Sequence, residues 1–79
     1  SINNQIILIL QHIDYLLKLK GKKSPYGFAA YSISKLDKPV SSMKYNLKKI
    51  RGVGNVTEKI IWEILDSGTS KYYERLLTS

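Results

Sequence analysis

The chain has 79 residues, and its thirteen Lys and Arg against six Asp and Glu give a formal net charge of +7. It has no cysteine, which excludes disulfides, thiolate nucleophiles and Cys-based zinc sites and favours a cytoplasmic protein, in the nucleoid or nucleus if it acts on DNA. A hydrophobic content of 43% suffices for one folded domain, whereas the excess of positive charge indicates either a polyanionic partner or a surface that only maintains solubility.

The first predicted helix begins at Asn3 or Asn4, either of which can cap it, and runs to about Lys20 before Gly21 ends it. Its apolar residues recur at three- and four-residue spacing, which is typical of an amphipathic helix. They are Ile6, Ile9, Leu10, Ile13, Leu16 and Leu17.

A second, shorter helix is predicted to follow, with Ser24 as its cap and Pro25 in its first turn. Lys38 marks its end, because the residue before Pro39 is pushed out of the helical region. Its inner face is expected to contain Phe28, Tyr31, Ile33 and Leu36, with Ala29 and Ala30 allowing close contact between helices.

After a loop at residues 40–42, Ser42 is expected to cap a third helix whose inner face carries Met43, Leu47 and Ile50. Two glycines in the following three residues, Gly52-Val53-Gly54, predict a tight turn with unusual backbone angles.

Asn55 is then expected to cap a fourth helix, with Glu58 completing a capping box. The segment 66–68 ends this helix, and a last short helix begins near Ser70. No segment alternates as a strand does. The sequence therefore predicts an all-α domain over residues 1–79, a compact bundle of four to five short helices.

The turn between the third and fourth helices has the features of a phosphate-binding site. The fourth helix presents unpaired N–H groups and the positive end of its dipole, and glycines let an oxygen anion approach the backbone. Basic residues surround this point. The candidate nucleic-acid-binding residues are Tyr31, Lys44, Lys48, Lys49, Arg51, Gly52, Val53, Gly54, Asn55 and Lys59. The simpler alternative is an antiparallel helix connection, in which glycine is also common.

The stretch from Leu47 to Ile61 resembles the helix-hairpin-helix motif of DNA-repair and replication proteins. With Asn4–Leu19, Pro25–Tyr31 and the segment 66–68, nearly the whole chain is similar to the N-terminal domain of family X DNA polymerases, the polymerase beta lyase domain. This resemblance implies DNA binding through the hairpin. It also implies a monovalent cation, Na⁺ or K⁺, held by the backbone carbonyls of Lys48, Ile50 and Val53; no other cofactor is expected.

Lyase members of that family use a lysine of the second hairpin helix to form a Schiff base with an abasic sugar. By ungapped match from the Gly-Val-Gly turn, this lysine falls on Ile60 and a phosphate-binding lysine falls on Val56. Basic residues of the lyase members correspond to Tyr26 and Gly27. Lys59, one position away, points elsewhere, because one residue turns a helix by about 100°. The domain is therefore expected to bind DNA and not to be an enzyme.

Several other residues have two readings. Lys18, Lys20, Lys22 and Lys23 form a second basic cluster, which either extends the nucleic-acid face or is a solvated helix end. Three aromatic residues could stack on unpaired bases, although packing is the favoured reading: they are Trp62, Tyr72 and Tyr73. His12 is expected at the core or its rim.

The function predicted from the sequence is non-sequence-specific DNA binding by an accessory domain of a DNA repair or replication protein. The alternatives are a 5′-deoxyribose phosphate lyase and a protein-interaction module, and RNA stays open as the partner. A membrane partner is not expected, because no segment has the ~18 apolar residues of a span. The first residue is Ser rather than Met, and we expect the chain to be a piece of a longer protein with other domains.

Overall fold

Apolar residues recur at three- and four-residue spacing along the chain, which favours helices, and the computed structural model describes all residues 1–79 without a strand. Four α-helices are present: α1 (Ile2–Leu19), α2 (Tyr26–Ser34), α3 (Asn55–Ser67) and α4 (Lys71–Thr78). Two short 3₁₀ helices, η1 (Val40–Met43) and η2 (Leu47–Lys49), lie between α2 and α3. The prediction of an all-α bundle is confirmed. None of the helices is both long and apolar enough to cross a membrane.

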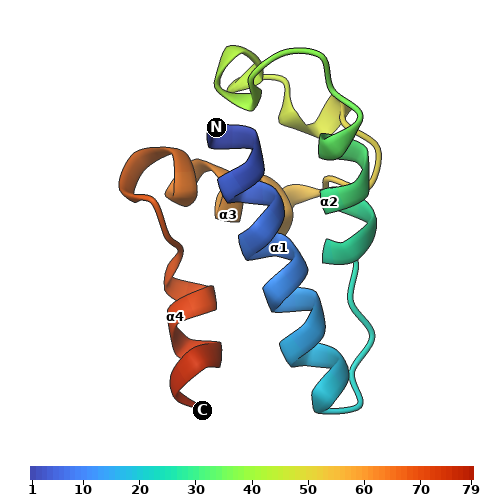
Figure 1. Ribbon diagram of the computed structural model, residues 1–79, viewed down its shortest axis with the longest axis vertical. Coiled ribbons are helices and arrows are strands. Elements are labelled where there is room, and N and C mark those ends of the chain that lie inside the picture. The colour runs from blue at the N-terminus through green and yellow to red at the C-terminus, as the bar shows by residue number, and fades with distance from the viewer.

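Helix α1 is the central element, with α2 along one side, α4 along the other and α3 behind it in the view of Figure 1. Ser1, and not Asn3 or Asn4, caps α1, because its hydroxyl accepts from the Asn4 N–H at 3.3 Å. Asn3 instead holds a loop: its side-chain amide bonds the Lys38 carbonyl at 2.9 Å and the Val40 N–H at 2.7 Å. Gly21 follows the helix with a φ of +73°, as expected of a residue that ends it.

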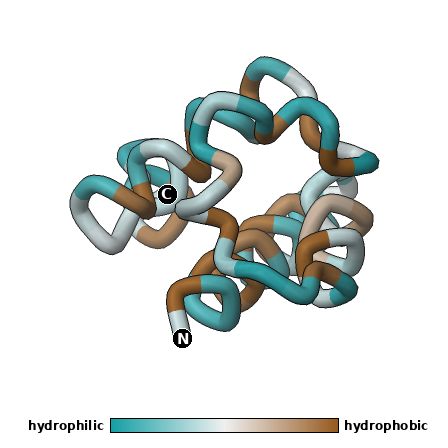
Figure 2. The backbone as a smooth tube through the Cα atoms, turned by 90° about the horizontal axis from the view of Figure 1, so that it is seen from above, coloured by the Kyte–Doolittle hydropathy of each residue, from teal (hydrophilic) through white to brown (hydrophobic).

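The core is built from the inner faces of α1, α2 and α3, and Figure 2 shows how apolar positions recur along the helices between polar ones. Its buried members are Ile6, Leu10, Ile13, Leu17, Tyr26, Ala29, Ala30, Ile33, Val40, Leu47, Ile50, Val53, Ile60, Ile61 and Ile64. Of the stripe predicted for α1, Ile6, Leu10, Ile13 and Leu17 are buried, whereas Ile9 and Leu16 are half-buried. The inner face predicted for α2 was partly wrong: Ala29, Ala30 and Ile33 are buried, whereas Phe28 and Tyr31 are exposed.

The predicted third helix is not an α-helix. The segment 40–50 forms η1 and η2, and the Ser42 hydroxyl donates to the Pro39 carbonyl at 2.7 Å instead of capping a helix. Serine and asparagine in this segment compete for backbone hydrogen bonds, and Asn46 separates the two turns. Val40, Leu47 and Ile50 are buried in the core and Met43 packs against it half-buried, which holds the segment without a continuous apolar face.

The remaining boundaries follow the predicted signals with small shifts. Helix α2 ends at Ser34, four residues before Lys38, and a turn in which Leu36 donates to Ile33 follows it. Gly68 ends α3 in the left-handed conformation, with a φ of +85°. Ser70 caps α4 by accepting from the Tyr73 N–H at 3.1 Å. No residue of α4 is fully buried, so this helix lies on the surface of the core.

Candidate nucleic-acid interface

Residues 50–54 form the turn between η2 and α3, and one glycine in it, Gly52, lets the chain reverse its direction. Gly52 has a φ of +87°, a conformation that L side chains rarely adopt. The Val53 N–H donates to the Ile50 carbonyl at 3.1 Å and closes the turn, and the Val53 and Ile50 side chains are buried in the core. Val53 therefore anchors the turn, and only its backbone is available to a ligand.

The start of α3 is open to solvent and has no side-chain cap. Gly54 occupies the N-cap position with extended backbone angles, φ −103° and ψ −164°, which any residue can adopt. The prediction of two glycines with unusual angles is thus correct for Gly52 and wrong for Gly54. A Cβ added at Gly54 would meet nothing within 4 Å. The fold does not require this glycine, and the space in front of it is empty of protein.

Asn55 is the first residue of α3 and does not cap it. Its side-chain oxygen accepts from the Lys48 ammonium at 2.8 Å, so the two sides of the turn are joined. The first helical hydrogen bond runs from the Glu58 N–H to the Gly54 carbonyl at 2.9 Å. The amides before Glu58 therefore have no helical acceptor, and they point outward with the positive end of the helix dipole.

The basic residues predicted for the interface are all exposed, and the structure divides them between two sides of the turn. Lys49 and Arg51 line a groove against α2, which also contains Tyr31. Lys44 and Lys59 line a different groove beside Trp62. Lys48 lies between the two, at the start of α3. A chain of phosphates crossing the turn would have cations on both sides.

Two aromatic side chains of α2 belong to this site, and the sequence reasoning assigned one of them to the core alone. Phe28 is 51% exposed and lies directly over the turn, because a Cβ at Gly52 would be 2.7 Å from its Cδ2. Tyr31 is 58% exposed and has the Lys35 ammonium 5.2 Å from its ring centroid. Helix α2 has two faces that could be buried, one with Phe28 and Tyr31 and one with Ala29 and Ala30. The two alanines could have indicated the buried face, because small residues allow close contact between helices.

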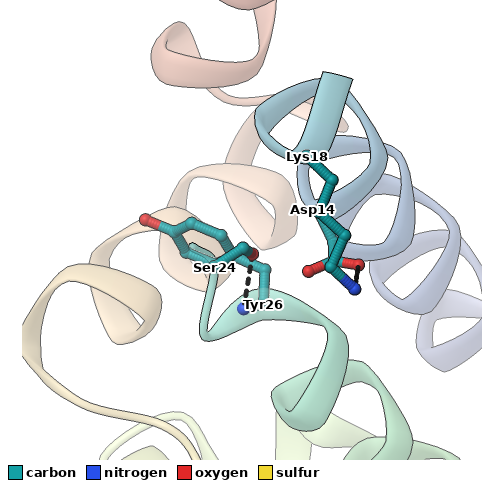
Figure 3. A network of polar contacts seen from close by, with 4 residues as sticks. All are labelled: Asp14, Lys18, Ser24 and Tyr26. Carbon is teal, nitrogen blue, oxygen red and sulfur yellow. Dashed lines mark hydrogen bonds and ion pairs between the residues drawn. The ribbon is translucent and has the colours of Figure 1, made fainter. Parts of the chain in front are cut away.

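The position of α2 depends on a carboxylate that the sequence reasoning did not single out. Asp14 of α1 binds the Lys18 ammonium at 2.9 Å, and its other oxygen is buried on the side of Ser24 (Figure 3). The carboxylate also lies against Gly27, in the first turn of α2. The hydrogen bond from Lys18, followed by the polar groups of Ser24 and Gly27, lowers the Asp14 pKa despite desolvation. Pro25 occupies the N-cap position, and the Ser24 hydroxyl before it accepts from the Tyr26 N–H at 3.1 Å, in line with the capping role predicted for Ser24. The Asp14 carboxylate adds negative charge at the α2 N-terminus from a neighbouring helix.

The residues that would hold a monovalent cation are backbone carbonyls of the turn. Carbonyl oxygen is a suitable ligand for a hard cation, and the Ile50 carbonyl keeps a second lone pair beyond its bond to Val53. No cluster of three or more His, Cys, Asp or Glu side chains is placed to hold a metal ion. The donor set at Lys48, Ile50 and Val53 is therefore compatible with Na⁺ or K⁺ and unsuited to a transition metal.

The positions that correspond to the lyase lysines carry no amine. Ile60 is 3% exposed and belongs to the core, whereas Val56 lies exposed on the first turn of α3. Tyr26 is a buried phenol whose pKa is raised by burial and by the nearby Tyr72. Lys59 is exposed on the α3 surface, in open grooves shared with Trp62 on one side and Tyr72 on the other.

The other aromatic residues that had two readings, and His12, make contacts within the chain, with Tyr72 and Tyr73 packed against the core. The Trp62 Nε1–H donates to the Lys44 carbonyl at 2.8 Å and ties α3 to the end of η1. The His12 Nδ1 lies 2.6 Å from the Tyr73 hydroxyl, which confirms a histidine at the rim of the core. The second basic cluster (Lys18, Lys20, Lys22 and Lys23) lies at the C-terminal end of α1, far from the turn (Figure 1).

A family model described as a helix-hairpin-helix domain matches residues 1–70 of the chain. Comparisons with curated proteins and with solved structures gave no match. The matched region contains α1, α2 and the turn with α3, and it ends where α4 begins.

Proposed function

Because the chain belongs to the helix-hairpin-helix domain family, which generally binds nucleic acid, we propose that it binds DNA through the phosphate backbone without reading base sequence. One observation supports this proposal most directly: the uncapped start of α3 opens at Gly54, where nothing lies within 4 Å of an added Cβ. A phosphate oxygen can approach amides there that no protein group satisfies.

The charge around the turn supports the same ligand. Lys48 is fixed at the start of α3 by its bond to Asn55, and Lys49 and Arg51 lie exposed just before the turn. Contacts of this kind neutralise phosphates and release counterions, so the affinity falls steeply with salt. We further propose that a Na⁺ or K⁺ ion at the carbonyls of Lys48, Ile50 and Val53 would add positive charge beside the bound phosphate.

The proposed setting is an accessory domain of a DNA repair or replication protein, similar to the N-terminal domain of family X DNA polymerases. The order of α1, the Pro25–Tyr31 segment, the turn and α3 supports this resemblance. Within it, we propose binding without lyase chemistry, since a buried isoleucine stands at the Schiff-base position. Schiff-base formation needs an uncharged amine at that place.

A salt titration tests the proposal. Fluorescence anisotropy with several labelled duplexes of unrelated sequence should give similar affinities. A plot of log affinity against log salt should have a total slope of about −0.9 for each neutralised phosphate. Replacing Lys48, Lys49 and Arg51 by Gln should weaken binding and reduce the magnitude of the total slope by about 3.

The matched control replaces Lys20, Lys22 and Lys23 by Gln, which removes the same charge at the far end of α1. It should leave most of the slope in place. If both triple variants lose affinity equally, binding depends on net charge and not on the turn. If the wild-type chain shows no salt-dependent binding, the proposed function is wrong.

A further inference from the structure

The face of α1 that points away from the core carries three large apolar side chains, Leu8, Tyr15 and Leu19, each more than half exposed. An α-helix turns by about 100° per residue, so positions seven and eleven residues after Leu8 return to within about 20° of it. The three side chains therefore form one row, about 16 Å long, which we name the outer stripe. Single exposed apolar residues are ordinary, whereas a row along a whole helix marks an interaction surface.

The end of α4 lies beside the outer stripe. The His12 Nδ1 is 2.6 Å from the Tyr73 hydroxyl, and the Lys20 ammonium donates to the Ser79 hydroxyl at 2.7 Å, so α4 follows the second half of α1. Leu77 is exposed one turn after Tyr73. Figure 1 shows α2 and α4 on either side of α1 and no segment of the chain in front of it. Nothing within the chain covers this apolar face.

One end of the outer stripe is surrounded by positive charge. The second basic cluster is exposed there, and no Asp or Glu occurs in the sequence between Asp14 and Asp37. Asp14 is paired with Lys18 at 2.9 Å, and the other three lysines of the cluster form no ion pair. An apolar row with uncompensated cations at its end is complementary to a surface that is apolar and acidic.

The shape of this face fits a helix. None of the grooves of the molecule includes a residue of the outer stripe, so the face has no pocket for a small molecule or a single inserted side chain. Leu8 and Tyr15 are seven residues apart, which is the repeat through which α-helices pack side by side. A partner helix of about three turns would cover the whole row.

Other occupants fit this face less well. A second copy of the chain would bring its own net charge of +7 and the same basic cluster, so the two copies would repel. A DNA duplex has no apolar surface to cover the leucines. A helix that lies on an anionic membrane has basic residues along its flanks, whereas the flanks of the outer stripe carry Asn4, Gln5 and Gln11.

We propose that the outer stripe and the second basic cluster bind an amphipathic helix of a partner protein, with acidic residues beside its apolar row. The leucines and Tyr15 would pack against that row, and the lysines would pair with the carboxylates. This surface lies at the far end of α1 from the glycine turn (Figure 1), so it goes beyond the proposed function and does not depend on it.

A pair of synthetic helical peptides tests the charge of the partner. Both have about 18 residues with leucines at three- and four-residue spacing; one carries Glu at the flanking positions, and the matched control carries Lys there. Binding of the labelled peptides to the chain is measured by fluorescence anisotropy. The Glu peptide should bind at least about tenfold more tightly than the Lys peptide, and its affinity should fall with salt. No binding of the Glu peptide, or equal binding of both, overturns the inference.

A matched pair of tyrosine variants tests the outer stripe. Tyr15→Gln removes the central ring of the row, and Tyr45→Gln removes an exposed ring far from it in the sequence, on the segment before η2. Tyr15→Gln should weaken binding of the Glu peptide by at least about fivefold, and Tyr45→Gln should change it by less than about twofold. Equal effects of the two substitutions overturn the inference.

Carboxylates can also occupy a phosphate site, and the two triple variants of the salt titration separate the two surfaces. Replacing Lys20, Lys22 and Lys23 by Gln should weaken the Glu peptide by at least about fivefold and leave most of the DNA binding in place. Replacing Lys48, Lys49 and Arg51 by Gln should do the reverse. If only the second triple variant loses the peptide, the peptide binds at the glycine turn and the inference is wrong, whatever the result with DNA.

Two further measurements test the other occupants of this face. A dimer in sedimentation equilibrium that Tyr15→Gln dissociates would assign the outer stripe to a second copy of the chain. Binding to phosphatidylserine vesicles that Tyr15→Gln abolishes would assign it to a membrane. Either result overturns the inference, whereas a monomer that ignores such vesicles and binds the Glu peptide supports it.

Discussion

Helix α3 is flanked by two glycine turns with almost the same backbone conformation and opposite chemistry. Gly52 before the helix has a φ of +87°, and Gly68 after it has a φ of +85°. At the second turn the polar groups are used internally: the Gly68 N–H donates to the Ile64 carbonyl, and the Gly68 carbonyl accepts from the Gln5 side chain at 3.0 Å. At the first turn the helix amides are left free, and the surrounding side chains are basic.

The difference teaches that backbone shape alone does not identify a binding site in this molecule. Around the second turn the Thr69 hydroxyl donates to Glu74 at 2.8 Å, Ser70 is buried as a cap, and Asp66 adds negative charge. The polar groups of this turn are thus already hydrogen-bonded within the chain, and its negative charge disfavours a phosphate. The first turn combines unsatisfied donors with positive charge, the combination on which the proposed phosphate contact rests.

The largest expected effect comes from placing a methyl group on each turn. Gly52→Ala adds left-handed strain and a contact of 2.7 Å with Phe28, so we expect a loss of about 3 kcal/mol in the free energy of unfolding. Gly68→Ala has the same strain but meets only the flexible Gln5 amide at 3.3 Å, and about 1 kcal/mol should be lost. Urea denaturation measures the free energy of unfolding of each variant. Equal losses would show that the contact with Phe28 does not destabilise the Gly52 variant further.

A carboxylate placed at the first turn should lower its positive charge and so weaken DNA binding. Gly54→Asp suits the extended N-cap conformation and would satisfy an amide of α3, so stability should stay the same or rise by about 0.5 kcal/mol. DNA affinity should fall by more than about tenfold, because the carboxylate occupies and repels the phosphate position. Thermal unfolding and anisotropy together test this. Gly54→Ser, a neutral cap, should lose less affinity, and if it loses as much, space and not charge decides binding.

The start of α2 offers a third case, in which the carboxylate comes from another helix. Asp14→Asn should lower stability at neutral pH by about 0.5–1 kcal/mol, because it removes the charge that compensates this N-terminus. The Asp14 pKa is lowered in the folded chain, so its contribution is complete above the ordinary value of 3.8 and is lost as pH falls through the folded value. Melting temperatures of the two proteins should therefore converge at the acidic end. Asp37→Asn, at an exposed loop residue, is the control and should show no such convergence.

The smallest effect is expected from a test of catalysis at the first turn. Borohydride reduction on a substrate with a 5′-abasic sugar should give no adduct above a Lys59→Gln control, since Ile60 is a buried hydrocarbon. A trapped adduct on Lys59, identified by mass spectrometry, would mean that this lysine reaches the sugar from the neighbouring surface and that the binding-only proposal is wrong.

Much of this architecture could be predicted from the sequence because its signals are local. Most of the α1 stripe, the end of α1 at Gly21, the end of α3 within the segment 66–68 and the start of a last helix near Ser70 depend on signals within one or two helical turns, and the structure confirms them. The positions of the basic residues beside the turn were also readable from the sequence, and these residues are all exposed.

The errors concern choices that only tertiary packing makes. Which face of α2 is buried depends on how closely α1 approaches it, and the alanines allow a closeness that Phe28 would prevent. Asn3 and Asn55 had local roles available as caps, yet their amides bond partners 37 and seven positions away, Val40 and Lys48. Such long-range pairing leaves no periodic signal in the sequence.

The peripheral position of helix α4 determines which part of the molecule unfolds locally. None of its residues belongs to the fifteen-member core, and it is held at its edge by contacts such as those of Tyr72 with Tyr26 and of Lys20 with Ser79. Its amide hydrogens should exchange with solvent through local fraying, whereas those of α1 and α3 await cooperative unfolding. We therefore expect the C-terminal helix to detach and return many times while the glycine turn before α3 keeps its shape.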